Sequence, residues 1–97
     1  MTLRVELRPQ AERDLKRLEK FLLKLSAGAS QRRLNWLRAE IAMLAERPAR
    51  GRLALSPAQY ELILRYGRSR YLLRYRVTPS AVIIIRIFHG KERRPIW

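Results

Sequence analysis

Residues 71–94 read YLLRYRV, TPS, AVIIIRIF and HGKERR, and this stretch decides the fold. The two apolar runs are rich in aromatic and β-branched residues, which favour strands, and the Thr-Pro-Ser step between them is a turn signal. The stretch therefore predicts a β-hairpin with strands at residues 70–77 and 81–88, followed by a basic tail at residues 89–97. The strands contain Arg74, Arg76 and Arg86 at positions where a sheet more often has neutral side chains.

The N-terminal half predicts a strand followed by two helices. Residues 2–8 alternate apolar and charged side chains, which is typical of a half-buried strand. Leucines at helical spacing predict one amphipathic helix over residues 10–25 and another that ends near residue 46. Gly28 is expected to end the first helix in a left-handed conformation, and Ser30 is expected to cap the second.

The predicted element order is β-α-α-β-β-β, within a single domain that spans residues 1–97. A basic loop at residues 47–58 leads into a strand at residues 59–66, and a turn at residues 67–69 joins that strand to the hairpin. Three consecutive strands with short turns form an antiparallel meander, while the N-terminal strand is placed by its helical crossover. We therefore predict an α+β fold, an antiparallel sheet with a helical hairpin packed on one face and the other face open.

Period-two alternation assigns the side chains to the two faces of this sheet. The helix-covered face is expected to hold Tyr60, Leu62, Leu64, Tyr66, Tyr71, Leu73, Tyr75, Val77, Ile83, Ile85, Ile87 and His89. The open face is expected to hold a row of arginines, Arg65, Arg74, Arg76 and Arg86, interspersed with Leu72, Ile84 and Phe88. A register slip of one residue would move every side chain of a strand to the other face.

The charge of the chain favours an anionic partner; the alternative is a solvated basic surface in an organism whose GC-rich codons favour arginine. The formal net charge is +14, and 18 of the 22 cationic side chains are arginines. Residues 1–47 carry a net charge of +5 and residues 48–97 a net charge of +9, so most of the excess lies with the strands. A field of this size favours nucleic acid, an anionic surface or an acidic protein as partner, and arginine favours bidentate contacts to phosphate or carboxylate.

Several classes of site are excluded by composition. The chain has no cysteine, one histidine and one aspartate, so neither a metal centre nor a disulfide framework is expected, and no motif indicates a cofactor. The N-terminal segment lacks a signal-peptide core, and the longest apolar run, residues 81–85, is far shorter than a membrane span of about 20 residues. We therefore expect a cytoplasmic protein without a membrane partner.

The element order, the phrase YLLRYRV, the apolar last strand and the terminal HGKERR together resemble the ParE/RelE toxin superfamily of bacterial toxin–antitoxin modules. The resemblance covers nearly the whole chain and is most specific over residues 67–77 (GRSRYLLRYRV) and 81–94 (AVIIIRIFHGKERR). It implies a type II toxin held inactive by a cognate ParD-like antitoxin, whose acidic C-terminal segment wraps the toxin. It also implies a hetero-oligomer with the antitoxin, a heterotetramer or larger.

The branches of this superfamily differ in their targets. Toxins similar to RelE are ribosome-dependent ribonucleases that cut mRNA, whereas toxins similar to ParE poison DNA gyrase. RNA cleavage through the 2′-hydroxyl needs a base, an acid and cations on the phosphate. By resemblance to RelE-like sites, Leu72 replaces an arginine, Ile63 replaces one of two lysines and Trp97 replaces a tyrosine, while the step from His89 to Gly90 is ParE-like. The sequence therefore favours a gyrase inhibitor.

Two alternatives remain open beside the gyrase inhibitor. The first is a RelE-like mRNA endonuclease that uses Arg65, Arg74, Arg86 and His89 with an altered catalytic set. The second is a non-catalytic nucleic-acid-binding module, for which the chain offers a poor platform of stacking aromatic side chains.

Under the favoured interpretation no catalytic residue is assigned, and the chain binds its target and antitoxin through cationic side chains and a terminal tryptophan. These residues are Arg65, Arg74, Arg76, Arg86, Lys91, Arg93, Arg94 and Trp97. His89 has a structural interpretation as well, as a strand-end histidine that faces the helices and is hydrogen-bonded at the following turn. Trp36 likewise is either an exposed anchor for a partner or a side chain at the rim of the core.

Overall fold

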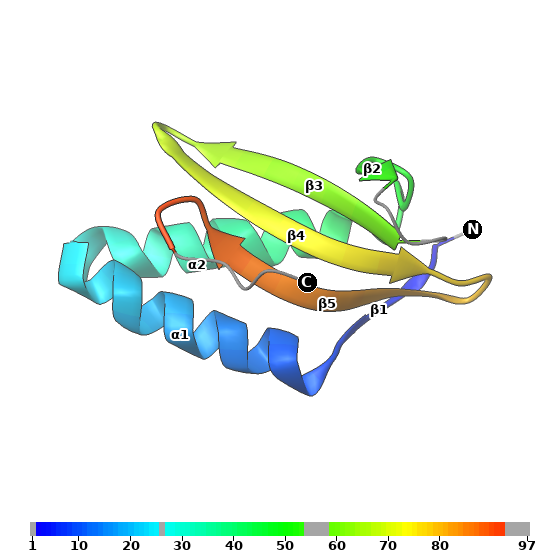
Figure 1. Cartoon of the computed structure of the whole chain (residues 1–97), viewed down its shortest axis with the longest axis horizontal. Coiled ribbons are helices and arrows are strands. Elements are labelled where there is room, and N and C mark those ends of the chain that lie inside the picture. Colours follow the sequence, from blue (N-terminus) through cyan, green and yellow to red (C-terminus); the bar gives the residue numbers. More distant parts are fainter. Residues whose placement is uncertain (1, 26, 54–58, 93–97) are drawn as a thin grey trace.

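The computed structural model describes residues 2–25, 27–53 and 59–92 of the chain (Figure 1). The elements are β1 (Arg4–Leu7), α1 (Pro9–Leu25), α2 (Ala27–Met43), β2 (Arg52–Leu53), β3 (Gln59–Tyr66), β4 (Ser69–Val77) and β5 (Ala81–His89). The predicted order is therefore confirmed, with one addition, the two-residue strand β2 inside the predicted basic loop. Among the described helices, none is long and apolar enough to cross a membrane.

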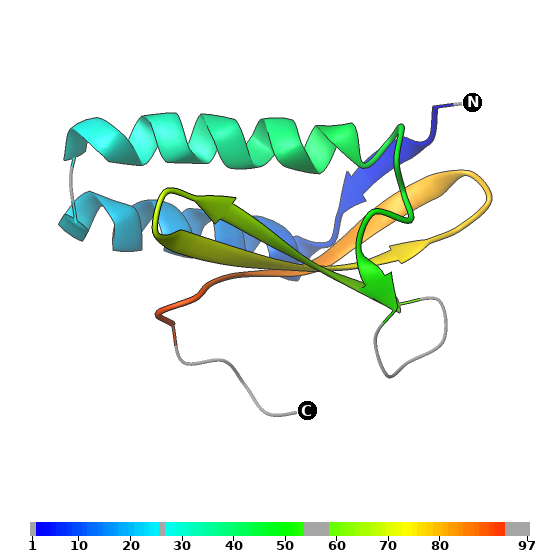
Figure 2. The same ribbon diagram turned by 90° about the horizontal axis from the view of Figure 1, so that it is seen from above.

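The strands form one sheet in the order β1-β5-β4-β3-β2. The meander of β3, β4 and β5 is antiparallel, as predicted. Strand β1 pairs with β5 in the parallel sense, so the sheet is mixed and the prediction of an antiparallel sheet is wrong for this edge. Only a tight turn forces neighbouring strands to be antiparallel, and β1 is separated from β5 by both helices and three strands. Both helices lie on the same side of the sheet (Figure 2).

The first helix matches its prediction and the start of the second does not. Helix α1 begins at Pro9, where the missing N–H of proline is harmless. Helix α2 already begins at Ala27, so the expected left-handed conformation at Gly28 and the expected cap at Ser30 are both wrong. A glycine costs a helix only about 1 kcal/mol, which packing against α1 can outweigh. Among the described glycines only Gly67, in the turn after β3, has a positive φ, of 59°.

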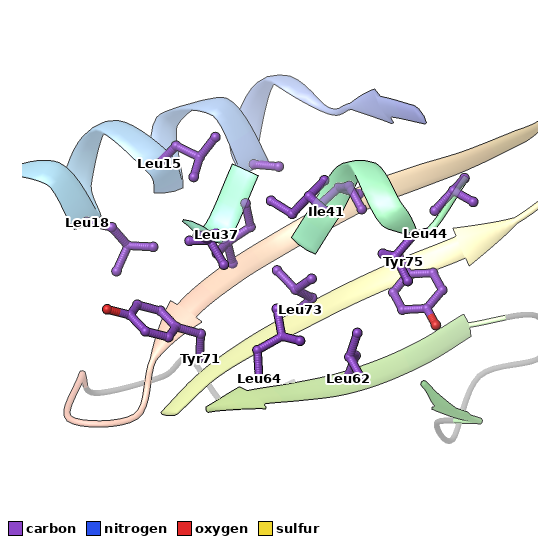
Figure 3. Close-up of a cluster of buried hydrophobic side chains, with 14 residues drawn as sticks. Leu15, Leu18, Leu37, Ile41, Leu44, Leu62, Leu64, Tyr71, Leu73 and Tyr75 are labelled. Atoms are coloured by element: carbon purple, nitrogen blue, oxygen red, sulfur yellow. The ribbon is translucent and has the colours of Figure 1, made fainter. Parts of the chain in front are cut away.

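The core lies between the helical hairpin and the sheet (Figure 3). Its members are Ala11, Leu15, Leu18, Leu37, Ile41, Leu44, Leu62, Leu64, Tyr71, Leu73, Tyr75, Val82, Ile84 and Ile87. The faces predicted for β3 and β4 are confirmed, because the inward residues of both strands belong to this cluster or pack against it. Outward residues of β3 such as Ile63 and Arg65 are exposed.

The faces predicted for β5 are half wrong because the strand contains a bulge. Leu73 pairs with Ile87 and Arg74 with Arg86, but the next residue of β4, Tyr75, pairs with Ile84. The extra residue, Ile85, shifts the alternation by one position. Val82 and Ile84 therefore point into the core, in place of Ile83 and Ile85, while Ile87 and His89 point inward as predicted. The predicted open face consequently loses Ile84 and keeps Arg86 and Phe88.

Strand β2 is held by a tyrosine of the core. The hydroxyl of Tyr75 accepts a hydrogen bond from the backbone N–H of Gly51 at 2.7 Å, and its ring stacks on Tyr60 with centroids 5.3 Å apart. This bond positions Arg52 and Leu53 opposite Glu61 and Tyr60 of β3. A two-residue strand carries no alternation, so sequence reasoning had no pattern from which to predict it.

Candidate functional site

Side chains of α1 complete the edge of β5 beyond the end of β1. The parallel pairing with β1 stops at Ile84, whose carbonyl accepts the N–H of Arg8 at 3.0 Å. At Ile87 the backbone N–H donates to the carboxylate of Asp14 at 2.8 Å, and the carbonyl accepts from the guanidinium of Arg17 at 2.8 Å. Two polar residues of one helix therefore take the place of a missing strand and tie α1 to the sheet.

Asp14 is the centre of this arrangement and is fully buried. Besides the N–H of Ile87, it accepts hydrogen bonds from Arg86 at 2.9 and 3.3 Å, from Gln10 at 3.2 Å and from Arg17. Burial by itself would raise the pKa of this carboxyl. The hydrogen bonds from Arg86, Ile87, Arg17 and Gln10 outweigh burial, and the pKa is lowered below its ordinary value. Asp14 is therefore ionised in the folded protein.

Arg17 connects Asp14 to the segment after β5. Its guanidinium donates to both carboxylate oxygens of Glu92, at 2.6 and 3.1 Å, and Glu92 also accepts the N–H of His89 at 2.8 Å. The bond to Glu92 raises the pKa of Arg17. The chain is thus fixed to α1 as far as Glu92. The sequence analysis did not predict Asp14, Arg17 or Glu92 as site residues. The one available signal was the position of Asp14 on the apolar stripe of its helix, between Ala11 and Leu18.

The predicted row of arginines divides into two kinds. Arg74 and Arg86 lie opposite each other on β4 and β5, and their like charges are offset by Glu61, 2.7 Å from Arg74, and by Asp14. The guanidinium of Arg86 also lies 4.6 Å from the centre of the Phe88 ring. Arg65 and Arg76 are exposed, and neither forms an ion pair with any carboxylate in the described part of the chain.

His89 lies on the face opposite to these arginines. It is buried at 1% exposure against Phe21 of α1 and Tyr71 of β4, with ring centroids 4.9 and 5.0 Å away. Its Nδ1 accepts the backbone N–H of Lys91 at 3.0 Å, as the structural interpretation of this residue predicts. Burial lowers the pKa of His89; Arg33 and Lys91 lower it further, and Glu92 opposes them. His89 is therefore a neutral core side chain at neutral pH.

The remaining predicted residues lie at the rim of the molecule or outside its described part. Lys91 is exposed in the turn after β5. Trp36 packs against Tyr66 and Tyr71, with centroids 5.0 and 5.7 Å apart, which confirms the interpretation as a side chain at the rim of the core. Arg93, Arg94 and Trp97 lie outside the described residues.

Comparison with known proteins identifies the family. A model described as the ParE toxin of the type II toxin–antitoxin system parDE matches residues 5–94. The chain belongs to the ParE/RelE toxin superfamily. Two curated relatives of Caulobacter vibrioides agree with this ParE/RelE membership. Toxin RelE3 is 40% identical over 90 residues, which cover 93% of this chain and 97% of the relative. Toxin RelE1 is 37% identical over 94 residues, which cover 97% and 100%.

Solved structures of both branches share the ParE/RelE fold of this chain. The chromosomal ParDE system from P. aeruginosa matches with a TM-score of 0.73 and 17% identity over 89% of this chain and 94% of the other. An arginine double mutant of the E. coli toxin RelE in the free state matches with a TM-score of 0.60 and 20% identity over 90% and 82%. The chain is the toxin of a type II toxin–antitoxin system, and its fold is common to the ParE and RelE branches.

The buried histidine of this ParE/RelE toxin makes its stability depend on pH. Because the pKa of His89 is lower in the folded protein than the ordinary value of 6.5, the unfolded chain binds the proton more readily. The free energy of unfolding should be constant above pH 6.5 and fall as the pH decreases below it, by about 1.4 kcal/mol for each unit between the two pKa values. Urea unfolding at pH 8, 6.5 and 5 measures this fall. The variant His89→Gln should lose the dependence in this range, and an unchanged slope would contradict the assignment.

Proposed function

We propose that this toxin acts by inhibiting DNA gyrase and is neutralised by a cognate ParD-like antitoxin. The observation that carries the proposal is the position of His89. It is the sole imidazole of the chain, and it faces the helices while Arg65, Arg74 and Arg86 face the other side of the sheet. A general acid or base must come within hydrogen-bond distance of the group it serves, and the phosphate it acts on would lie at the arginines.

The other polar groups of the open face give no substitute for the histidine. Glu61 forms an ion pair with Arg74, and Asp14 forms one with Arg86. Both carboxylates therefore serve as partners of arginines and not as general bases. Leu72 and Phe88 lie opposite each other between these arginines and the end of the sheet, and both are buried. The described part of the open face therefore offers exposed cations and the exposed apolar side chain of Ile63, which suit binding to a protein target better than RNA cleavage.

A second candidate is a ribosome-dependent mRNA endonuclease that uses Arg65, Arg74, Arg86 and His89. It is favoured by one observation, the name RelE carried by both curated relatives at 40% and 37% identity. This function would require His89 to leave its place between Phe21 and Tyr71 and to reach the open face, with loss of the bond to Lys91.

The antitoxin is proposed to bind through an acidic C-terminal segment, in a heterotetramer or larger complex in the cytoplasm. The support is charge: the chain carries +14, and Arg65 and Arg76 are exposed without a carboxylate partner among the described residues. Complementary charge accelerates association and excludes wrong partners. Arg74, Arg86, Lys91, Arg93, Arg94 and Trp97 remain proposed contacts for the antitoxin or for gyrase.

The proposal predicts the result of one paired experiment. The purified toxin should stabilise cleaved plasmid or abolish supercoiling when it is added to gyrase, plasmid and ATP, and it should leave mRNA on translating ribosomes intact. The variant His89→Gln, once shown to fold by circular dichroism, should inhibit gyrase within about threefold of the parent, because His89 does not reach the target surface. If gyrase is unaffected and mRNA is cut, with loss of cutting in His89→Gln, the endonuclease is the function.

A further inference from the structure

A basic groove lies where β1 passes into α1, beside the bulge of β5. Its volume is about 550 Å³, and it is lined by Arg8, Pro9, Gln10, Arg13, Arg76, Ile85 and Arg86. Four of these seven residues are arginines, and they come from three separate parts of the chain. Figure 1 shows the start of α1 (blue) below β5 (orange), and the two elements are in contact.

The bulge shapes this groove. The extra residue of β5, Ile85, lies between Ile84, which points into the core, and Arg86, which turns to Asp14. Strand β1 ends opposite Ile84, so beyond this point β5 has no strand on that side, and side chains of α1 complete its edge only at Ile87. Bulges at sheet edges commonly redirect side chains at functional sites. Here the bulge turns Ile85 to the groove.

The charge of the groove is largely uncompensated. Arg8, Arg13 and Arg76 are exposed, and no ion pair joins any of them to a carboxylate in the described part of the chain. Arg13 donates to the side-chain oxygen of Gln10 at 3.0 Å, which holds the guanidinium beside the groove without reducing its charge. Of the two carboxylates in the first turns of α1, Asp14 already serves Arg86 and Arg17, and Glu12 forms no ion pair within the described part of the chain. The groove therefore carries an excess of about three positive charges that a ligand has to match.

We propose that this groove binds the phosphate backbone of duplex DNA. Guanidinium groups bind phosphate oxygens in a bidentate manner, and protein–DNA interfaces are polar and strongly positive. A peptide partner would need apolar anchors, and the large exposed apolar side chains of the described residues, Leu23, Met43, Leu53 and Ile63, line no part of this groove. With Gln10 as the sole neutral polar side chain of the lining, the groove contacts backbone and reads no base sequence.

DNA binding by this groove extends the proposed function. It rests on that function for the place where the contact would act, because gyrase holds duplex DNA. The toxin then contacts DNA phosphates as well as the gyrase protein, and its action at the DNA–gyrase complex depends on salt. The DNA contact itself belongs to the toxin and is measurable without gyrase.

The test is fluorescence anisotropy of a labelled 20-base-pair duplex titrated with the full-length toxin at several salt concentrations. Arg8→Ala and Arg76→Ala should each weaken binding about fivefold at 0.15 M salt and reduce the slope of log K against log salt by about 0.9, as expected for one lost phosphate contact. The double variant should show both losses. Arg32→Ala, which removes an exposed arginine of α2 on the helical side, is the matched control and should bind as the parent does.

Two results would overturn the proposal. In the first, Arg8→Ala and Arg76→Ala bind the duplex with the affinity and salt slope of Arg32→Ala. In the second, the duplex does not bind, whereas labelled poly-L-glutamate binds the parent and does not bind either variant. The groove would then be a site for an acidic protein. Supercoiling assays on the same proteins separate DNA binding by the groove from gyrase inhibition. If the toxin inhibits gyrase but does not bind the duplex, DNA binding by the groove is wrong and the proposed function stands. If the toxin binds the duplex but does not inhibit gyrase, the proposed function is wrong.

Discussion

The variant Asp14→Ala should lower the free energy of unfolding by about 3 kcal/mol. The substitution leaves the buried N–H of Ile87 without its acceptor, and an orphaned buried donor costs about 1–3 kcal/mol. It also removes the carboxylate from Arg86, whose side chain is 13% exposed. Breaking a buried ion pair costs about 3–5 kcal/mol, but Arg17 is 38% exposed and regains water, which reduces the total.

Urea unfolding measures this loss, with Glu19→Ala as the control. Glu19 is an exposed carboxylate of the same helix, and its removal should change the free energy of unfolding by less than about 0.5 kcal/mol. Asp14→Asn keeps an acceptor for the N–H of Ile87 but removes the charge. Its free energy of unfolding should therefore decrease by less than that of Asp14→Ala and by more than that of Glu19→Ala. A change in Asp14→Ala no larger than in Glu19→Ala would show that α1 is tied to β5 by packing alone.

The same carboxylate gives a second, more acidic pH dependence. Its pKa is lower in the folded protein than the ordinary 3.8, so the stabilisation is complete above that value and is lost as the pH falls through the folded pKa. The loss from His89 begins near pH 6.5, at a higher pH, because a neutral histidine is favoured in the core. The two residues therefore act in separate ranges of pH.

Much of the fold could be predicted because local and long-range patterns agree. Strand β3 begins and ends at the predicted residues, 59 and 66, and β4 and β5 differ from their predictions by one residue at one end. In β3 and β4 each inward position is apolar or aromatic, so alternation alone determines the face. Gly28 shows the limit of local rules, since a small cost in helix propensity does not decide where a packed helix begins.

Strand β5 could not be predicted from alternation. Residues 81–85 read AVIII, and a run of β-branched and small apolar residues fits either face equally well. The bulge at Ile85 is determined by the partners on both sides, β1 as far as Ile84 and Asp14 at Ile87, and these are distant in sequence. The arginines of the candidate site could be predicted to share a face; which of them are ion-paired depends on Asp14 and Glu61, whose positions only the tertiary structure gives.

The variant Gly51→Ala should lower the free energy of unfolding by about 3 kcal/mol. An added Cβ would lie 2.6 Å from the hydroxyl oxygen of Tyr75 and 2.8 Å from the backbone oxygen of Glu61, far inside contact distance. Tyr75 is fully buried, and Glu61 is paired with Arg52 of β2 on one side and with Arg74 of β4 on the other, so neither can move freely. Overpacking of this kind costs about 1–3 kcal/mol, and the loss of the 2.7 Å hydrogen bond from the N–H of Gly51 costs about 1 kcal/mol more.

A matched glycine and a double variant test the cause. An added Cβ at Gly28 meets nothing within 4 Å, so Gly28→Ala should stabilise the helix by up to about 1 kcal/mol in the same urea assay. Tyr75→Phe removes both the hydroxyl that clashes and the hydrogen bond that would be lost. Gly51→Ala combined with Tyr75→Phe should therefore cost less than the two single changes added together, by about 1 kcal/mol or more. Additive losses would mean that Gly51 is required for the conformation of its loop and not for its contact with Tyr75.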